Sequence, residues 1–197
     1  MLSQRGNIIV GTNDTFDSQF EEGVISEESV QGQLLARTFG GDRNHLDRLI
    51  DKSLAGTPSE EDGTKQFGKT RRYPIGTVAV VEFGDARYFL PAFTKMSAGR
   101  PPHVNSTIEW LQISLARTWE AISQAGQREP VHLPVIGSHL ARLGVSRTLL
   151  IQMIVLSFIA ADPRRVASHL TVYVNPADEN TVDMAVLDEW LRGVCAV

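Results

Sequence analysis

The chain has 197 residues, of which 42% are hydrophobic and 21% are charged, and its formal net charge is −4. These values are ordinary for a soluble globular protein, and the length is enough for one domain with a sizeable core. The negative charge argues against a nucleic-acid partner, because broad nucleic-acid binding needs a basic face that displaces counterions.

The single cysteine and the hydropathy pattern bear on where the protein works. Cys195 is alone, which excludes an intrachain disulfide or a zinc cluster built on cysteines and points to a reducing compartment. No apolar run is long enough to span a bilayer, and no secretory signal opens the chain. We therefore expect one domain over residues 1–197, located in the cytoplasm and without membrane contact of its own.

The first half of the chain predicts one strand, two helices and a long loop. Residues 7–11 form an apolar run typical of a buried strand, which ends in the polar loop 12–17. Serine and acidic capping residues just before Val30 predict that a helix begins there, and residues 46–54 have helical spacing. A loop rich in glycine, proline and acidic residues follows over residues 55–70.

A small basic cluster lies at the end of this loop. It consists of Lys65, Lys69, Arg71 and Arg72. No aromatic residues are interleaved with these cations to stack nucleic-acid bases. We therefore expect the cluster to be a solvated flank of the loop.

The second half predicts an antiparallel hairpin and a long helix. Strands over residues 76–83 and 87–93 are joined by a tight turn at Gly84. Residues 105–107 can cap a helix that ends near Gly126. Its apolar residues recur on one face and are expected in the core: Ile108, Leu111, Leu115, Trp119 and Ile122.

The remaining elements continue the alternation of strands and helices. They are a strand over 131–136, a mostly buried helix over 146–160, a strand over 170–174 and a closing helix over 181–192. Such alternation predicts an α/β protein, and the hairpin makes its sheet mixed rather than purely parallel. The five histidines lack the spacing and neighbouring acids of a zinc site, so we expect no metal.

The most informative stretch is the junction between the strand at 131–136 and the following helix. Gly137, Ser138 and Ala141 are small enough to let a ligand approach the main chain. Free backbone N–H groups and the helix dipole make such a junction a seat for an anion. The alternative is an ordinary strand-to-helix loop, in which Gly137 and Gly144 only permit the turn.

Four segments, in order and spacing, resemble the ADP-ribose-binding macro domain. They are Ile-Ile-Val-Gly-Thr-Asn at 8–13, Val-Gln-Gly at 30–32, Tyr-Pro-Ile-Gly-Thr at 73–77 and Pro-Val-Ile-Gly-Ser-His-Leu-Ala-Arg at 134–142. Within the superfamily, the chain most resembles the macro module of the type II Thoeris antiphage effector. The resemblance implies a three-layer α/β/α fold with a mixed central sheet.

The resemblance also implies a ligand and a set of binding residues. The ligand would be ADP-ribose or a derivative, bound without a cofactor. Asn13 would face the ribose at the reactive end, Val30 and Gly32 would cover the diphosphate, and residues 137–142 would cradle it. The full set is Thr12, Asn13, Asp14, Ser29, Val30, Gly32, Gly137, Ser138, His139, Leu140, Ala141, Arg142, Asn175 and Pro176. Asn175 and Pro176 would close over the adenosine half.

Departures from the family pattern shape the functional expectation. Hydrolytic relatives carry a glycine run where this chain has Glu27, Glu28 and Ser29, so we favour a binding module over an enzyme. The alternative is an ADP-ribosyl hydrolase that positions a water with Asn13 and Asp14. A third reading is an interaction domain with a degenerate pocket.

The same departures bear on the ligand and its source. His139 stands in place of a family glycine, so we expect a polar group on the distal ribose. By the resemblance, an amino-acid conjugate made by a TIR-domain enzyme is the leading candidate. The parent protein would then be anchored in a membrane, with this module on the cytoplasmic side.

Overall fold

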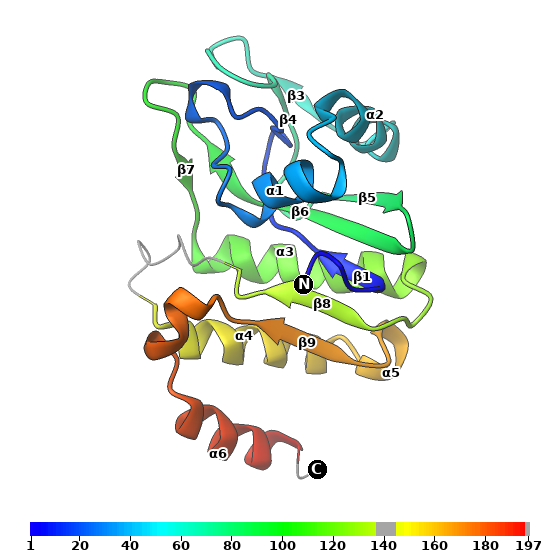
Figure 1. Ribbon diagram of the computed structural model, residues 1–197, viewed down its shortest axis with the longest axis vertical. Coiled ribbons are helices and arrows are strands. Elements are labelled where there is room, and N and C mark those ends of the chain that lie inside the picture. Colours follow the sequence, from blue (N-terminus) through cyan, green and yellow to red (C-terminus); the bar gives the residue numbers. More distant parts are fainter. Residues whose placement is uncertain (137–144, 196–197) are drawn as a thin grey trace.

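The computed structural model describes residues 1–136 and 145–195 and shows a central sheet with helices on both faces (Figure 1). The strands are β1 (Gly6–Ile9), β2 (Thr12–Asn13), β3 (Glu60–Glu61), β4 (Arg71–Arg72), β5 (Val78–Phe83), β6 (Ala86–Met96), β7 (Val104–Asn105), β8 (Val131–Pro134) and β9 (Leu170–Tyr173). The α-helices are α1 (Val30–Gln33), α2 (Arg43–Ser53), α3 (Ile108–Ala125), α4 (Arg147–Ala160), α5 (Pro163–Val166) and α6 (Met184–Cys195). Three short helical segments are η1 (Glu21–Gly23), the π-helical η2 (Leu34–Thr38) and η4 (Pro176–Thr181).

The sheet is mixed, as the sequence predicts. Strand β1 lies between β6 and β8 and runs parallel to both, and β9 is parallel to β8. Strand β2 continues along β6 in parallel, whereas β5 and β7 pair with β6 in the antiparallel sense. Strands β3 and β4 form a separate antiparallel pair.

Two apolar cores cover the two faces of the sheet. The alternation of a strand sends Ile8 to the core under α2 and Ile9 to the core under α3 and α4. Strand β6 divides in the same way, with Phe89 in the α3 core and Leu90 in the α2 core. Because each face has its own helices and its own core, the fold is the predicted three-layer α/β/α arrangement.

Helix α3 begins and ends as the sequence predicts. Thr107 is its N-cap and accepts a hydrogen bond from the backbone N–H of Trp110 at 3.1 Å. The predicted apolar face is buried from Leu111 to Ile122, but Ile108 in the first turn is 38% exposed. The expectation that Ile108 joins the core was wrong, because the first turn of the helix leaves this side chain exposed.

The closing helix begins later than the predicted residue 181. Asn175 accepts a hydrogen bond from the backbone N–H of Ala177 at 3.0 Å and so starts the 3-10 segment η4. The carboxylate of Asp183 then accepts from the N–H of Val186 at 3.0 Å, which caps α6. The predicted start at 181 therefore falls at the end of η4, and α6 begins after the second cap.

Among residues 1–136 and 145–195, no helix is both long and apolar enough to cross a membrane.

Trp119 is the largest fully buried side chain in the part of the chain that the structure describes. It packs edge-on against Phe158, with ring centroids 5.4 Å apart, and its indole N–H donates to Ser157 at 2.9 Å. Trp119→Ala is expected to lower the free energy of unfolding by about 3–5 kcal/mol, because it leaves a large cavity between α3 and α4. Urea denaturation measures this loss. The control Gln112→Ala, on the exposed face of α3, is expected to stay within about 0.5 kcal/mol of the parent, and equal losses in the two variants would contradict the packing.

Candidate functional site

The candidate site lies at the carboxyl edge of the sheet. Strands β1, β6, β8 and β9 are parallel, so their C-terminal ends meet at one edge (Figure 1). In open α/β sheets this edge is where ligands bind. Segments that leave it include the loop after β2, the β6–β7 connection and η4. The predicted ligand residues Gly137, Ser138, His139, Leu140, Ala141 and Arg142 follow β8 and lie outside the described residues.

The loop after β2 is folded around the side chain of Asn13, which is 3% exposed. Its Oδ1 accepts hydrogen bonds from the backbone N–H groups of Thr15 at 3.0 Å and Asp17 at 3.2 Å. Its Nδ2 donates to Oδ2 of Asp17 at 3.0 Å. Phe16, at the centre of this turn, is fully buried with a φ of +51°, a region that residues other than glycine rarely occupy. The loop is therefore closely constrained, and Thr12 before it is also buried.

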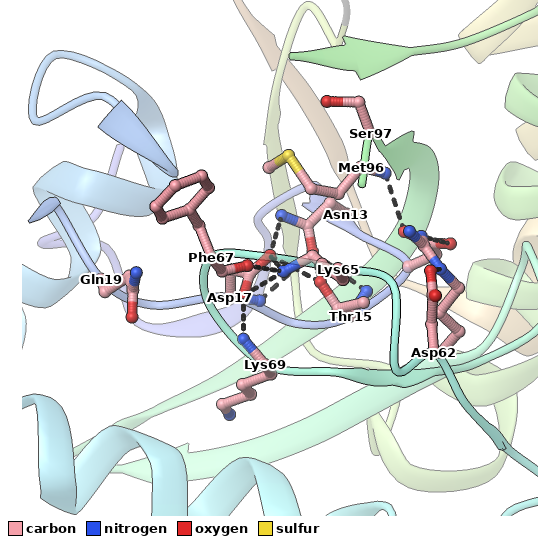
Figure 2. A network of polar contacts seen from close by, with 12 residues as sticks. Asn13, Thr15, Asp17, Gln19, Asp62, Lys65, Phe67, Lys69, Met96 and Ser97 are labelled. Atoms are coloured by element: carbon pink, nitrogen blue, oxygen red, sulfur yellow. Dashed lines mark hydrogen bonds and ion pairs between the residues drawn. The ribbon is translucent and has the colours of Figure 1, made fainter. Parts of the chain in front are cut away.

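The carboxylate of Asp17 is the centre of the network that Figure 2 shows. It is completely buried and accepts from Nζ of Lys65 at 3.1 and 3.2 Å, from the backbone N–H of Lys69 at 2.6 Å and from the hydroxyl of Thr15 at 2.5 Å. A buried charge needs a paired countercharge and several hydrogen bonds to offset its desolvation. Asp17 has both, so the cost of burying its carboxylate is offset.

The prediction that the basic cluster at residues 65–72 is a solvated flank of the loop was wrong. The side chain of Lys65 is 1% exposed and also donates to the carbonyl of Phe67. Lys69 pairs with Asp47 at 2.7 Å, so only Arg71 keeps a largely exposed side chain. The cluster turns inward because its carboxylate partners come from other parts of the chain, which the local composition of the loop does not reveal.

Both carboxylate oxygens of Asp14 also accept hydrogen bonds from the protein. Its Oδ1 accepts from the backbone N–H of Met96 at 2.8 Å, and its Oδ2 accepts from Arg72 at 2.8 Å. Arg72 in turn donates to Asp62 at 2.7 Å. These contacts fasten the loop after β2 to the end of β6 and to the segment that carries Asp62.

Two pKa shifts accompany this arrangement. Burial lowers the pKa of Arg72, but hydrogen bonds and charges from Asp62 and Asp14 outweigh it, so the pKa is raised above its ordinary value. The hydrogen bond from the Thr64 side chain, with those from Arg72 and the Thr64 backbone, lowers the pKa of Asp62 to about 2. Both shifts favour the charged forms and therefore keep the ion pair intact near neutral pH.

The second part of the predicted first loop is the start of α1. Ser29 is the N-cap and accepts from the N–H of Gly32 at 2.9 Å, and Val30 opens the helix. A Cβ on Gly32 would lie 2.3 Å from the carbonyl oxygen of Ser26, so glycine is required by the close approach of the chain to itself. Gln31 donates from its side chain to the carbonyl of Asp17 and links α1 to the network.

The third predicted segment connects η4 to the beginning of α4. Asp178 pairs with Arg147 at 2.8 Å, and the N–H of Asp183 donates to the hydroxyl of Thr148 at 2.9 Å. Asn175 and Pro176 lie at the start of this segment, directly after β9. The structure thus brings all the described candidate residues to one edge of the sheet.

Sequence reasoning missed three members of this network, namely Asp17, Gln31 and Lys65. From the sequence, Lys65 was assigned to a solvated flank, and Asp17 and Gln31 were given no role. The sequence does show several charged residues in and near the loop after β2, which has few glycines. It does not show that Asp17 pairs with Lys65, because the two residues are 48 positions apart. The prediction that Asn13 and Asp14 contact a ligand directly stays a prediction.

A model of the family described as Thoeris protein ThsA, Macro domain, matches residues 1–175. The chain belongs to this family. The match to this ThsA macro-domain family runs from β1 through β9 and includes the whole loop after β2. It confirms the resemblance and the α/β fold that the sequence predicts.

Individual proteins also match parts of this chain. Thoeris protein ThsA of Bacillus amyloliquefaciens (strain Y2) is 27% identical over 136 residues, a match that covers 68% of this chain and 44% of the relative. This chain therefore matches less than half the length of that relative. Among solved structures, Alphavirus P23pro-zbd matches 95% of this chain and 22% of its own, with a TM-score of 0.47 and 13% identity.

Gly68 tests how tightly the chain closes around Asp17. Its φ is +74°, and a Cβ there would lie 2.0 Å from Oδ1 of Asp17. Gly56 has a similar φ of +81° with open space around it. Gly56→Ala is expected to cost about 1–2 kcal/mol from backbone strain alone, and Gly68→Ala at least about 1 kcal/mol more because the carboxylate must move.

Urea denaturation of the two variants separates the strain from the clash. Equal losses would mean that the network around Asp17 yields freely, which would contradict the tight packing described above.

Proposed function

We propose that this chain is a binding module for ADP-ribose or an ADP-ribose-derived signal nucleotide in antiphage defence. The observation that carries the proposal is the match of residues 1–175 to the ThsA macro-domain family. The fold supports it independently, because the candidate segments that the structure describes leave the carboxyl edge of a largely parallel sheet.

The state of the two aspartates supports binding rather than catalysis. A general base must be able to take a proton from a water or substrate. Both oxygens of Asp14 and both oxygens of Asp17 already accept hydrogen bonds from protein donors. The loop after β2 is also short of glycines and closely constrained, in contrast to the flexible glycine run of hydrolytic relatives.

The alternative function is an ADP-ribosyl hydrolase. It would use Asn13 and Asp14 to place a water against the distal ribose. This function requires that Asp14 leave Arg72 or the N–H of Met96 when the ligand binds, and so it requires a rearrangement of the loop.

The source and identity of the ligand form the finer part of the proposal. A defence signal would be made by a partner TIR-domain enzyme and would carry an amino acid, such as histidine, on the distal ribose. The module would sense it on the cytoplasmic side of a longer protein. Such a conjugate offers polar groups that plain ADP-ribose lacks, and an unmatched buried polar group costs about 1–3 kcal/mol.

ADP-ribose is expected to raise the melting temperature of the protein, and above its Kd the rise should grow with the logarithm of its concentration, because it binds the folded state alone. Differential scanning fluorimetry with ADP-ribose, the histidine conjugate and AMP measures the effect. The conjugate is expected to bind at least about tenfold more tightly than ADP-ribose. Equal affinities would leave a general ADP-ribose binder, and no shift with either compound would contradict the proposal.

A matched pair of glycine variants locates the binding. Gly137→Val is expected to abolish the thermal shift, because a branched Cβ would obstruct the main-chain approach that the family uses for the diphosphate. Gly193, in α6, has open space around it, so Gly193→Val serves as the control and is expected to keep the shift. An undiminished shift in Gly137→Val would place the ligand elsewhere.

Hydrolysis is expected to be absent or very slow. Incubation of the protein with ADP-ribosylated protein and with ADP-ribose conjugates should leave both intact by mass spectrometry, while binding persists. Rapid turnover that disappears in Asp14→Ala would reverse this assignment and favour the hydrolase.

A further inference from the structure

The amide of Asn13 has a fixed orientation. Its oxygen accepts from two backbone N–H groups, those of Thr15 and Asp17, and its nitrogen donates to the carboxylate of Asp17. Turning the amide by 180° would set its nitrogen against two N–H donors and its oxygen against a carboxylate. All three hydrogen bonds would be lost at once, so one orientation is strongly preferred.

The negative charge at Asp17 reinforces this orientation. A carboxylate only accepts hydrogen bonds, so it selects the nitrogen side of the Asn13 amide. Lys65 stabilises that charge, with Nζ at 3.1 and 3.2 Å from the two carboxylate oxygens and a side chain that is 1% exposed. Figure 2 shows Lys65, Asp17 and Asn13 in contact in this order. The contacts lead from residues 62–70, a segment that we call the strap and that carries Lys65, to the loop after β2.

One N–H of Asn13 remains. The side-chain amide has two protons, and one of them goes to Asp17. Within residues 1–136 and 145–195, the other proton makes no hydrogen bond, although Asn13 is only 3% exposed. A buried donor without a partner is costly, and a ligand oxygen can supply that partner.

We propose that Asp17 and Lys65 are positioning residues of the ligand site, which hold the Asn13 amide so that it offers the ligand a hydrogen-bond donor. The inference rests on the proposed function. It adds that the site selects an acceptor oxygen, such as that of a ribose hydroxyl or a phosphate, at the position of Asn13. It also makes the strap of residues 62–70, which carries Lys65, a determinant of ligand affinity.

An exchange of the two side chains tests this inference. The double variant Asn13→Asp with Asp17→Asn keeps an amide and a carboxylate in contact and keeps an oxygen for the N–H of Thr15. The carboxylate now stands at position 13, and a carboxylate cannot donate a hydrogen bond to the ligand. Isothermal titration is expected to give ADP-ribose binding at least about tenfold weaker than in the parent. Parent-like affinity in the exchanged variant would overturn the inference.

A second variant removes the charges and keeps the shape. Asp17→Asn with Lys65→Met leaves no unpaired buried charge, and the new amide can face Asn13 with either end. ADP-ribose is expected to bind about tenfold more weakly, with a folded spectrum by circular dichroism. The control is Asp51→Asn, which removes the more distant of the two carboxylates that pair with Lys69 and leaves its ion pair with Asp47. This variant is expected to bind ADP-ribose as the parent does.

A spectroscopic readout separates positioning from mere stability. In ¹⁵N-labelled parent protein, the two Nδ2 protons of Asn13, assigned with Asn13→Asp, are expected to shift when ADP-ribose is added. Unshifted Asn13 protons in a protein that binds ADP-ribose would overturn the inference and leave the proposed function intact. A parent protein that does not bind ADP-ribose would instead contradict the proposed function.

Discussion

The buried carboxylate of Asp17 is the constraint on which the candidate site depends. Taking a carboxylate out of water is costly, and here the cost is offset by an ammonium, a backbone N–H, a hydroxyl and an amide. These donors come from two segments that are about fifty residues apart in the chain. Asp17 therefore joins the loop after β2 to the strap of residues 62–70, and Gly68 is needed because the strap passes so close to it.

This constraint also supports the proposal of a binding module rather than a hydrolase. Hydrolysis would need a loop that can admit and orient a water, and a carboxylate with a free oxygen. In this chain Asn13, Asp14 and Asp17 all have their oxygens engaged by protein donors. Such a loop is preorganised, and preorganisation reduces the entropy cost of binding a ligand.

Local sequence patterns determine most of the fold. The strand around Ile8 and Ile9, the hairpin turn at Gly84 and the cap at Thr107 are each set by residues that lie next to one another, and the structure has all of them. The start of α6 is less accessible, because the polar stretch between the caps at Asn175 and Asp183 offers more than one residue that could begin a helix.

The candidate site, like the fold, could be predicted only where it depends on local sequence. The sequence places the loop after β2 and the segment after β9 at one edge, because parallel strands end together. It does not reveal that Lys65 turns inward, since the partner of a charged side chain depends on the tertiary fold rather than on its neighbours. For the same reason Asn13 and Asp14 present themselves in the sequence as free polar groups, whereas the structure holds them in a network.

The most direct test of this account is the map of amide chemical shifts when ADP-ribose is titrated into the ¹⁵N-labelled protein. The account predicts that the largest changes fall on residues 12–18, on the start of α1, on residues 137–142, where the family resemblance puts the diphosphate, and on residues 175–178. Changes confined instead to the groove between α3 and α4, lined by Trp119, Ser157 and Arg165, would contradict it.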